Sequence, residues 1–325
     1  MSRLLCVLTV SILLWVQAAA AQTSRTYPLP DGAAPVGLVI DAAGAVWFTS
    51  RSAGALGRLD AQTGETSLLS LGHGAQPSSL ATGPDGFLFA TDAVSNLVYQ
   101  VDPTSREVVR FPIESPAGPL ELSSATFDDR ERLWFTAYSG YFGWLEPRTG
   151  RSVVLPAPGG RGPAAVASAG AEVWFASYTT DAAIRVDPDT LRTEVFALPS
   201  GHEGPKSLAI GEDGEIWVAA YHSRALLRLD PKTSEWSAWP LPGPDAKPFG
   251  LAFDAQGDLR VSDVGQSALL TFDRRMRTFT ESVALGDGCM ARSIMQAGSG
   301  IWVAETRCDS IRFLGPDGRG TDGSR

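Results

Sequence analysis

Three acidic residues end segments of similar sequence: Asp92 ends GFLFATD, Asp263 ends GDLRVSD and Glu305 ends SGIWVAE. Hard cations such as Mg²⁺ and Ca²⁺ bind several carboxylate oxygens at once. If the three segments end at one rim of the fold, these residues are candidate metal ligands. The alternative is a solvated acidic rim, since the chain has 36 acidic and 27 basic residues.

Three tyrosines directly follow other segments of this kind, at one shared register: Tyr138, Tyr178 and Tyr221. A tyrosine combines a rigid apolar ring with a polar tip, which suits ligand recognition. Packing of these rings on neighbouring parts of the fold is the alternative. Lys206 and Ser78 share a second register, earlier in their own copies, and are candidate ligand contacts at the same rim.

These positions belong to a repeat that runs from residue 22 to about residue 316. One large residue anchors each of seven copies, at spacings of 40 to 45 residues: Trp47, Phe89, Trp134, Trp174, Trp217, Arg260 and Trp302. Each copy contains short β-type segments separated by turns rich in Gly, Pro and Asp, which is typical of a propeller blade. We therefore predict an all-β fold: a single seven-bladed β-propeller of four-stranded antiparallel blades.

The two ends of the chain predict how the ring closes. The last copy lacks an outer strand, whereas residues 26–30 match the outer strands at 110–113 and 238–241. We therefore expect the N-terminal strand to complete the last blade, which leaves few open sheet edges. Residues 317–325 are rich in Gly and Asp, and we expect them to form a disordered tail.

The first 21 residues have the composition of a signal peptide. Arg3 precedes an apolar run over 4–16, and Ala19–Ala21 offers a cleavage site. The run is too short for a membrane span. We expect a periplasmic or secreted protein with no membrane span after cleavage.

The amino-acid composition limits the classes of partner that this protein can bind. A hydrophobic content of 44% excludes wholesale disorder, and a net charge of −9 disfavours sequence-independent binding of nucleic acid. We expect a monomer with a small-molecule or peptide ligand and no nucleic-acid partner. Mg²⁺ or Ca²⁺ is the cofactor that the carboxylates would hold, if they hold one.

Export would leave two cysteines, Cys289 and Cys308, in an oxidising compartment. A two-residue turn at 298–299 would place them opposite each other across a hairpin, so we predict a disulfide. The same register places Arg292 opposite Glu305. Arg292 would then be a pairing partner and not a base, because a guanidinium stays protonated near neutral pH.

The blade pattern resembles the virginiamycin B (streptogramin B) lyase family. The matching residues are Pro35–Leu38, Val46–Thr49 and Leu56–Leu59, with a further match at Pro77–Leu80 and Gly83–Gly86. The resemblance implies a seven-bladed propeller that linearises a cyclic depsipeptide by elimination at its ester bond, with Mg²⁺.

The resemblance also implies site residues in the last blade. The family has a catalytic His that opens the inner strand, a Glu that ends the next strand and a further Glu near the metal. Glu305 matches the first Glu and is thereby a candidate catalytic residue. The His falls on Ala291 or Arg292, and the metal-side Glu on Cys289 or Met290, so both are absent.

Because no blade carries the His, we favour a propeller that binds a small molecule or peptide at its channel mouth. A metal-dependent carbon–oxygen lyase of the family type and a propeller lactone hydrolase are the alternatives. The chain has three histidines that could replace the missing base, all in expected loops: His73, His202 and His222.

Overall fold

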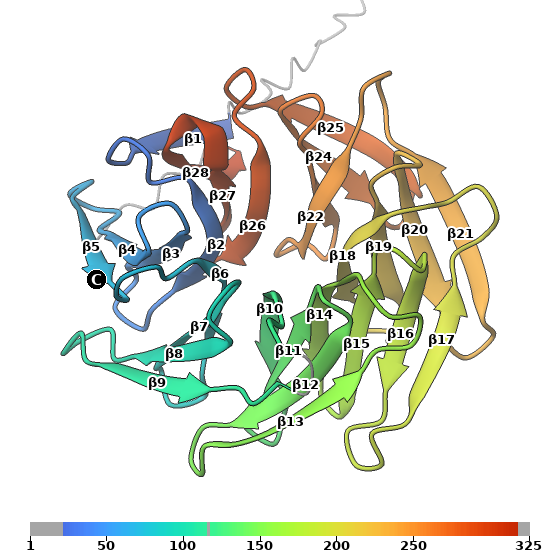
Figure 1. Cartoon of the computed structure of the whole chain (residues 1–325). Coiled ribbons are helices and arrows are strands. Elements are labelled where there is room, and N and C mark those ends of the chain that lie inside the picture. The colour runs from blue at the N-terminus through green and yellow to red at the C-terminus, as the bar shows by residue number, and fades with distance from the viewer. Residues whose placement is uncertain (1–21, 116–117, 318–325) are drawn as a thin grey trace, which may run out of the picture.

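The computed structural model describes residues 22–115 and 118–317. It consists of seven four-stranded antiparallel sheets arranged in a ring, with the first strand of each blade nearest the centre (Figure 1). The predicted all-β, seven-bladed propeller is confirmed. The predicted signal peptide (1–21) lies outside the described residues, as does the predicted tail from residue 318.

Each blade is a meander from the inner strand to the outer strand. Blade one contains β2 (Pro35–Ile40), β3 (Val46–Ser50), β4 (Ala55–Leu59) and β5 (Thr66–Ser70). Blade two contains β6 (Pro77–Thr82), β7 (Leu88–Asp92), β8 (Leu97–Val101) and β9 (Val108–Pro112). Blade three contains β10 (Leu122–Phe127), β11 (Leu133–Ala137), β12 (Tyr141–Glu146) and β13 (Arg151–Pro156). Blade four contains β14 (Pro163–Ala169), β15 (Glu172–Ser177), β16 (Ala182–Val186) and β17 (Thr193–Ala197).

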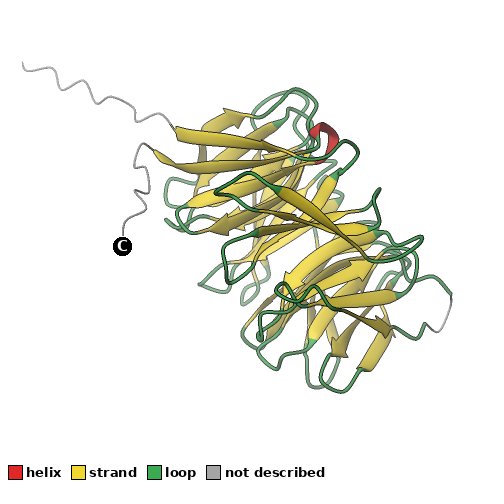
Figure 2. Ribbon diagram, turned by 90° about the vertical axis from the view of Figure 1, so that its left-hand side faces the viewer, coloured by secondary structure: helices red, strands yellow, loops and turns green. Residues whose placement is uncertain are grey.

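The remaining blades follow the same order. Blade five contains β18 (Pro205–Ile210), β19 (Ile216–Ala220), β20 (Ala225–Asp230) and β21 (Glu235–Pro240). Blade six contains β22 (Pro248–Phe253), β23 (Leu259–Asp263), β24 (Ala268–Asp273) and β25 (Thr278–Ala284). Blade seven contains β26 (Ala291–Ala297), β27 (Gly300–Glu305), β28 (Ser310–Asp317) and β1 (Gln22–Pro28), with the short helix η1 (Thr306–Cys308) between β27 and β28. Among the described residues, strand accounts for almost all regular structure (Figure 2).

The hydrophobic core lies between adjacent blades. Every residue of the second strands β3 and β11 is buried, because neighbouring blades cover both faces. One cluster joins Trp174 of blade four to Leu208 and Leu227 of blade five. Each blade is thus stabilised through its two neighbours, which makes closure of the ring important for stability.

The N-terminal strand closes the ring, as predicted. β1 pairs antiparallel with β28, with Tyr27 opposite Ile311. The Tyr27 ring stacks on Trp302 at 5.7 Å between centroids. The loop after β1 is also attached to blade seven, because the Asp309 carboxylate accepts hydrogen bonds from the N–H groups of Gly32 and Ala34.

An aspartate supports the anchor residue in three blades, and it is buried in two of them. The indole Nε1 of Trp134 donates to Asp128 Oδ2 at 2.7 Å, and Trp47 donates to Asp41 at the same distance. In blade six, Arg260 replaces the tryptophan, and its Nε donates to Asp254 at 3.0 Å. The sequence signal for this contact is an aspartate six residues before the anchor residue.

Replacing Asp128 by Asn should lower the free energy of unfolding by about 2 kcal/mol, because charge-assisted hydrogen bonds from Arg132 and Trp134 are weakened. Burial alone would raise the pKa of Asp128, but these hydrogen bonds outweigh it and hold the pKa below its ordinary value. The stabilisation is therefore present above about pH 4 and is lost as the pH falls through the lowered pKa. Urea unfolding between pH 3 and pH 7 measures this.

The matched control is Asp129→Asn, a change of the exposed neighbouring residue. Its unfolding free energy should follow the wild type at every pH. The difference between Asp128→Asn and wild type should shrink below pH 4. A difference that stays constant from pH 3 to pH 7 would contradict the role given to the Asp128 charge.

Candidate functional site

A β-bulge turns one residue of each inner strand toward the channel. In β18, for example, Pro205 pairs with Ala220 and Ser207 pairs with Ala219, which leaves Lys206 outside the ladder. Bulges commonly redirect side chains in this way. The equivalent residues of all seven blades line one mouth cavity of about 580 Å³: Val36, Ser78, Ser123, Ala164, Lys206, Phe249 and Arg292.

The bulge in blade seven corrects one prediction. Ala291 pairs with Glu305, and the register then shifts before Ile294 pairs with Val303. Arg292 therefore does not face Glu305, and the predicted ion pair between them is absent. Arg292 lies at the channel position equivalent to Lys206.

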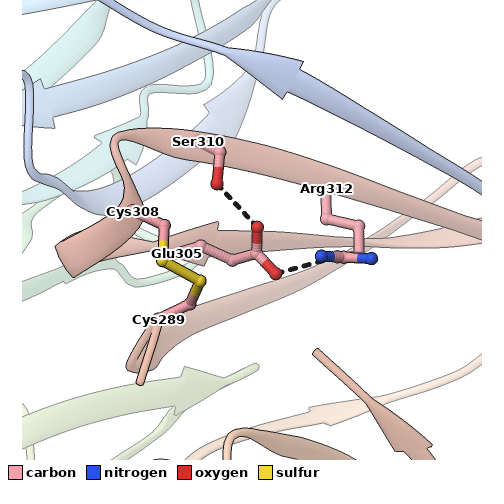
Figure 3. The surroundings of a disulfide bond; sticks show 5 residues. All are labelled: Cys289, Glu305, Cys308, Ser310 and Arg312. Atoms are coloured by element: carbon pink, nitrogen blue, oxygen red, sulfur yellow. Dashed lines mark hydrogen bonds and ion pairs between the residues drawn. A yellow bond between two sulfur atoms is a disulfide. The ribbon is translucent and has the colours of Figure 1, made fainter. Parts of the chain in front are cut away.

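Glu305 is held by its own blade instead. Its carboxylate accepts a hydrogen bond from Ser310 Oγ at 2.6 Å and pairs with Arg312 Nε at 2.8 Å (Figure 3). The side chain is 1% exposed. With both carboxylate oxygens occupied, Glu305 lies in the core of blade seven and is absent from the lining of the mouth cavity.

The disulfide between Cys289 and Cys308 is confirmed (Figure 3). It forms although the register has shifted, because both cysteines lie beyond the paired residues of β26 and β27. The Arg307 N–H also donates to the Cys289 carbonyl. The bond connects the start of blade seven to η1, directly before the strand that pairs with β1.

Asp92 and Asp263 cap backbone groups. Asp92 is buried, and its Oδ1 accepts hydrogen bonds from the N–H groups of Val94 and Ser95. Its Oδ2 accepts one from the Gln76 N–H. Asp263 repeats the arrangement with the corresponding loop residues of blade six. The physical role of both is to stabilise the turn after the second strand.

The three carboxylates do not fit a Mg²⁺ or Ca²⁺ site. Asp92, Asp263 and Glu305 are all buried and engaged in hydrogen bonds, and Arg312 brings positive charge to Glu305. Over residues 22–115 and 118–317, no three His, Cys, Asp or Glu side chains group as a metal site. The expected acidic rim is therefore replaced by three separate structural carboxylates.

The predicted tyrosines lie in an aromatic belt, which consists of Tyr138, Tyr178, His222, Tyr221 and Phe249. Ring centroids are 6.3 Å apart for Tyr138 and Tyr178, and 6.4 Å apart for Tyr221 and Phe249. His222 lies between Tyr178 and Tyr221, at 5.3 Å from each ring. The sequence placed the three tyrosines together but did not identify His222 as the link.

Lys206 extends from blade five over this belt. Its Nζ lies 3.6 Å from the Tyr178 ring centroid and 5.7 Å from that of Tyr138, which is cation–π geometry. Burial, and then the positive charge of Arg292, lower the pKa of Lys206. Burial raises the pKa of Tyr138 and Tyr178, so both hydroxyls remain donors at neutral pH.

Ser78 lines the mouth, but its hydroxyl is already bonded. Ser78 Oγ donates to the Leu122 carbonyl of blade three at 2.7 Å and lies 2.9 Å from Thr91 Oγ1. Ser123 makes the equivalent contact with the Pro163 carbonyl of blade four. These serines connect adjacent blades, which leaves them little capacity for a ligand.

The sequence did not identify Arg51 as a site residue. Arg51 directly follows β3, and Tyr138 and Tyr221 directly follow the corresponding strands of their blades. The sequence signal for Arg51 is therefore its position directly after a second strand, which it shares with these tyrosines. Arg51 lines the mouth cavity together with Arg292.

The three histidines are spread over the rim. His73 lines a second hollow beside the mouth. His222 Nε2 is 2.6 Å from the Tyr178 hydroxyl. His202 Nδ1 is buried and has no hydrogen-bond partner within the described part of the chain.

The sequence of nearly the whole chain matches the model of one protein family. The model of the virginiamycin B lyase family matches residues 17–229 and, in a second match, residues 70–322. The chain belongs to the virginiamycin B lyase family. Its blades carry the family's architecture, while the channel position of its seventh blade carries Arg292. No curated protein matches the sequence significantly.

Several solved structures share the fold of this chain. A catalytically inactive histidine-to-alanine variant of virginiamycin B lyase from Staphylococcus aureus, solved with quinupristin, is 19% identical with a TM-score of 0.83, covering 91% of this chain and 100% of that chain. A streptogramin B lyase is 20% identical with a TM-score of 0.80, covering 90% and 97%. Hydrazine synthase of Kuenenia stuttgartiensis is 15% identical with a TM-score of 0.73, covering 94% and 100%.

At these low sequence identities, the structural similarity shows a shared fold and does not show a shared function. Within the residues described, no helix is long and apolar enough to span a membrane.

Proposed function

We propose that this protein is an exported propeller that binds a small molecule or peptide at its channel mouth, without the elimination chemistry of its family. The mouth cavity has a volume of about 580 Å³, which is within the usual range for small-molecule sites. Polar and aromatic residues converge on it from several blades. Export is supported by the signal-like sequence of residues 1–21 and by the disulfide.

The observation that carries the proposal is Arg292 at the channel position of blade seven. Elimination needs a base that can accept a proton near neutral pH, and an arginine side chain cannot. Glu305, the remaining candidate, is buried between Ser310 and Arg312. The Staphylococcus aureus enzyme offers a parallel, because its inactive histidine-to-alanine variant was solved with quinupristin.

A carbon–oxygen lyase remains the second candidate because of one observation. The Tyr178 hydroxyl and His222 Nε2 are 2.6 Å apart in the aromatic belt, and an imidazole is the kind of group that serves as a general base. The assay for turnover therefore has to be run directly.

We expect no turnover of quinupristin by the purified protein in the presence of Mg²⁺. Liquid chromatography with mass spectrometry and NMR separates the outcomes: a new product of unchanged mass with a new double bond indicates a lyase, and addition of water indicates a hydrolase. The Staphylococcus aureus lyase serves as positive control. Either product, formed at a rate proportional to protein concentration, would contradict a binding-only role.

Binding at the mouth is tested by filling it. Ala164 lines the cavity, so Ala164→Trp should remove binding of small aromatic probes; Val195→Trp places the same ring on an exposed outer strand of the same blade. Ligand-observed NMR with benzoate, benzamide and benzylamine measures this. We expect at least one probe to bind wild type and Val195→Trp, and none to bind Ala164→Trp. Equal binding by both variants would overturn the proposal.

A further inference from the structure

The charge at the mouth is opposite to that of the whole protein. Arg51, Lys206 and Arg292 line the cavity, while Glu121 is its one carboxylate among the residues described. Glu121 is already paired with Arg161 at 2.9 Å. A chain of net charge −9 therefore collects three cations at the opening of its channel.

These cations lack anionic partners. Over the described residues, Arg51, Lys206 and Arg292 form no ion pair, and the Arg292 Nε has no hydrogen-bond partner although it is buried. By contrast, the half-buried Arg132 and Arg312 are each paired with a carboxylate within 3 Å. Leaving a buried donor unpaired costs free energy, so a site that keeps one is suited to a ligand that supplies the acceptor.

The cations also repel one another. Burial, followed by the charges of Arg51 and Arg307, lowers the pKa of Arg292. Burial, followed by the charge of Arg292, lowers the pKa of Lys206. A bound anion would offset the repulsion between the cations, because opposite charge favours the protonated form of each group. The free protein thus carries an electrostatic cost that an anion relieves.

A second hollow of about 690 Å³ adjoins the mouth cavity. The two share Val36, Arg51 and Arg292, and His73 lines the second hollow without lining the mouth cavity. No Asp or Glu lines this hollow within the described part of the chain. Arg51 and Arg292 therefore lie between the two hollows, so they can contact an anionic group in either one.

Aromatic side chains line the mouth beside these cations. Tyr138 and Phe249 line the cavity, and the Arg292 guanidinium carbon is 5.8 Å from the Phe249 ring centroid. A ligand held at its anionic end by the arginines would place its remaining atoms against the aromatic belt. Guanidinium groups match the oxygens of carboxylate and phosphate equally well.

We propose that Arg51, Arg292 and Lys206 form an oxyanion-binding site at the channel mouth, which takes an organic anion by its carboxylate or phosphate group and packs the apolar part of that molecule on the aromatic belt. This assignment rests on the proposed binding function and names the ligand class. Because the net charge of the chain is −9, the three cations at the mouth attract anions to a protein that repels them on average.

The test is calorimetric titration of the purified protein with benzoate, phenyl phosphate and neutral benzamide. We expect both anions to bind at least tenfold more tightly than benzamide, and the stronger of the two identifies the site as one for carboxylate or for phosphate. Arg292→Gln and Lys206→Met should each weaken binding of the anions at least tenfold. Arg192→Gln, a change of an exposed arginine away from both hollows, should not.

Thermal melting of each variant without ligand checks that it is folded. Benzamide binding as tight as that of the anions, or equal anion affinity in Arg292→Gln, Lys206→Met and Arg192→Gln, would overturn the oxyanion site. The proposed binding function would survive that result if Ala164→Trp still removes probe binding. It would fail separately if Ala164→Trp binds every probe as well as wild type does.

Discussion

Tyr27→Ala is expected to lower the free energy of unfolding by about 4 kcal/mol, the usual cost of removing a large buried aromatic ring. Tyr27 is 5% exposed and stacks on Trp302 of blade seven. Its hydroxyl donates to the Ala61 carbonyl of blade one at 3.0 Å. The side chain thus joins the closing strand to both blades that meet at the seam of the ring. Chemical unfolding followed by tryptophan fluorescence measures the loss.

Tyr27→Phe is the matched control. It keeps the ring and removes the hydrogen bond, so it should cost about 1 kcal/mol. The difference between the two variants reports the packing of the ring at the seam. A loss below about 1 kcal/mol for Tyr27→Ala would mean that closure by β1 contributes little to stability.

Removing the disulfide should lower the free energy of unfolding by about 3 kcal/mol, the value expected for a loop of this length. The bond spans 19 residues and connects Cys289 to Cys308. The Cys289→Ala/Cys308→Ala double variant should therefore melt several degrees lower than the wild type. Reduction with dithiothreitol should lower the melting temperature of the wild type toward the same value.

The double variant itself should not respond to dithiothreitol, which separates loss of the disulfide from other effects of the reductant. Because the bond lies in the closing blade, Tyr27→Ala and the double variant should be non-additive. Equal melting temperatures for wild type and double variant would show that blade seven is already held by β1 alone.

The site shows how one propeller can carry different chemistry at its mouth. Seven bulges turn seven residues toward the channel whatever their identity, so the fold tolerates Val36 and Ser123 as readily as Lys206 and Arg292. Gly250 is a further requirement of this geometry, because a Cβ there would lie 2.8 Å from the Arg292 carbonyl oxygen. The backbone is constrained while the side chains at the mouth are free to differ.

The sequence by itself determined the architecture of this protein. The repeated anchor residues and turns specified seven blades, since each blade is a local meander whose strands lie close together in the chain. Ring closure by β1 was also predictable, because a missing outer strand at one end matched a spare strand at the other. The disulfide followed from a hairpin of short sequence separation.

The tertiary structure decided the site. A one-residue bulge moved Arg292 from Glu305 to the channel, and sequence alternation cannot reveal such a shift. Asp92 and Asp263 have the residue type of metal ligands and end equivalent strands, but the backbone N–H groups of adjacent loops occupy their oxygens. Whether a carboxylate caps a turn or faces a ligand depends on which donors the fold brings within hydrogen-bond distance. For the same reason, the chain's acidic excess did not predict a mouth lined by three cations.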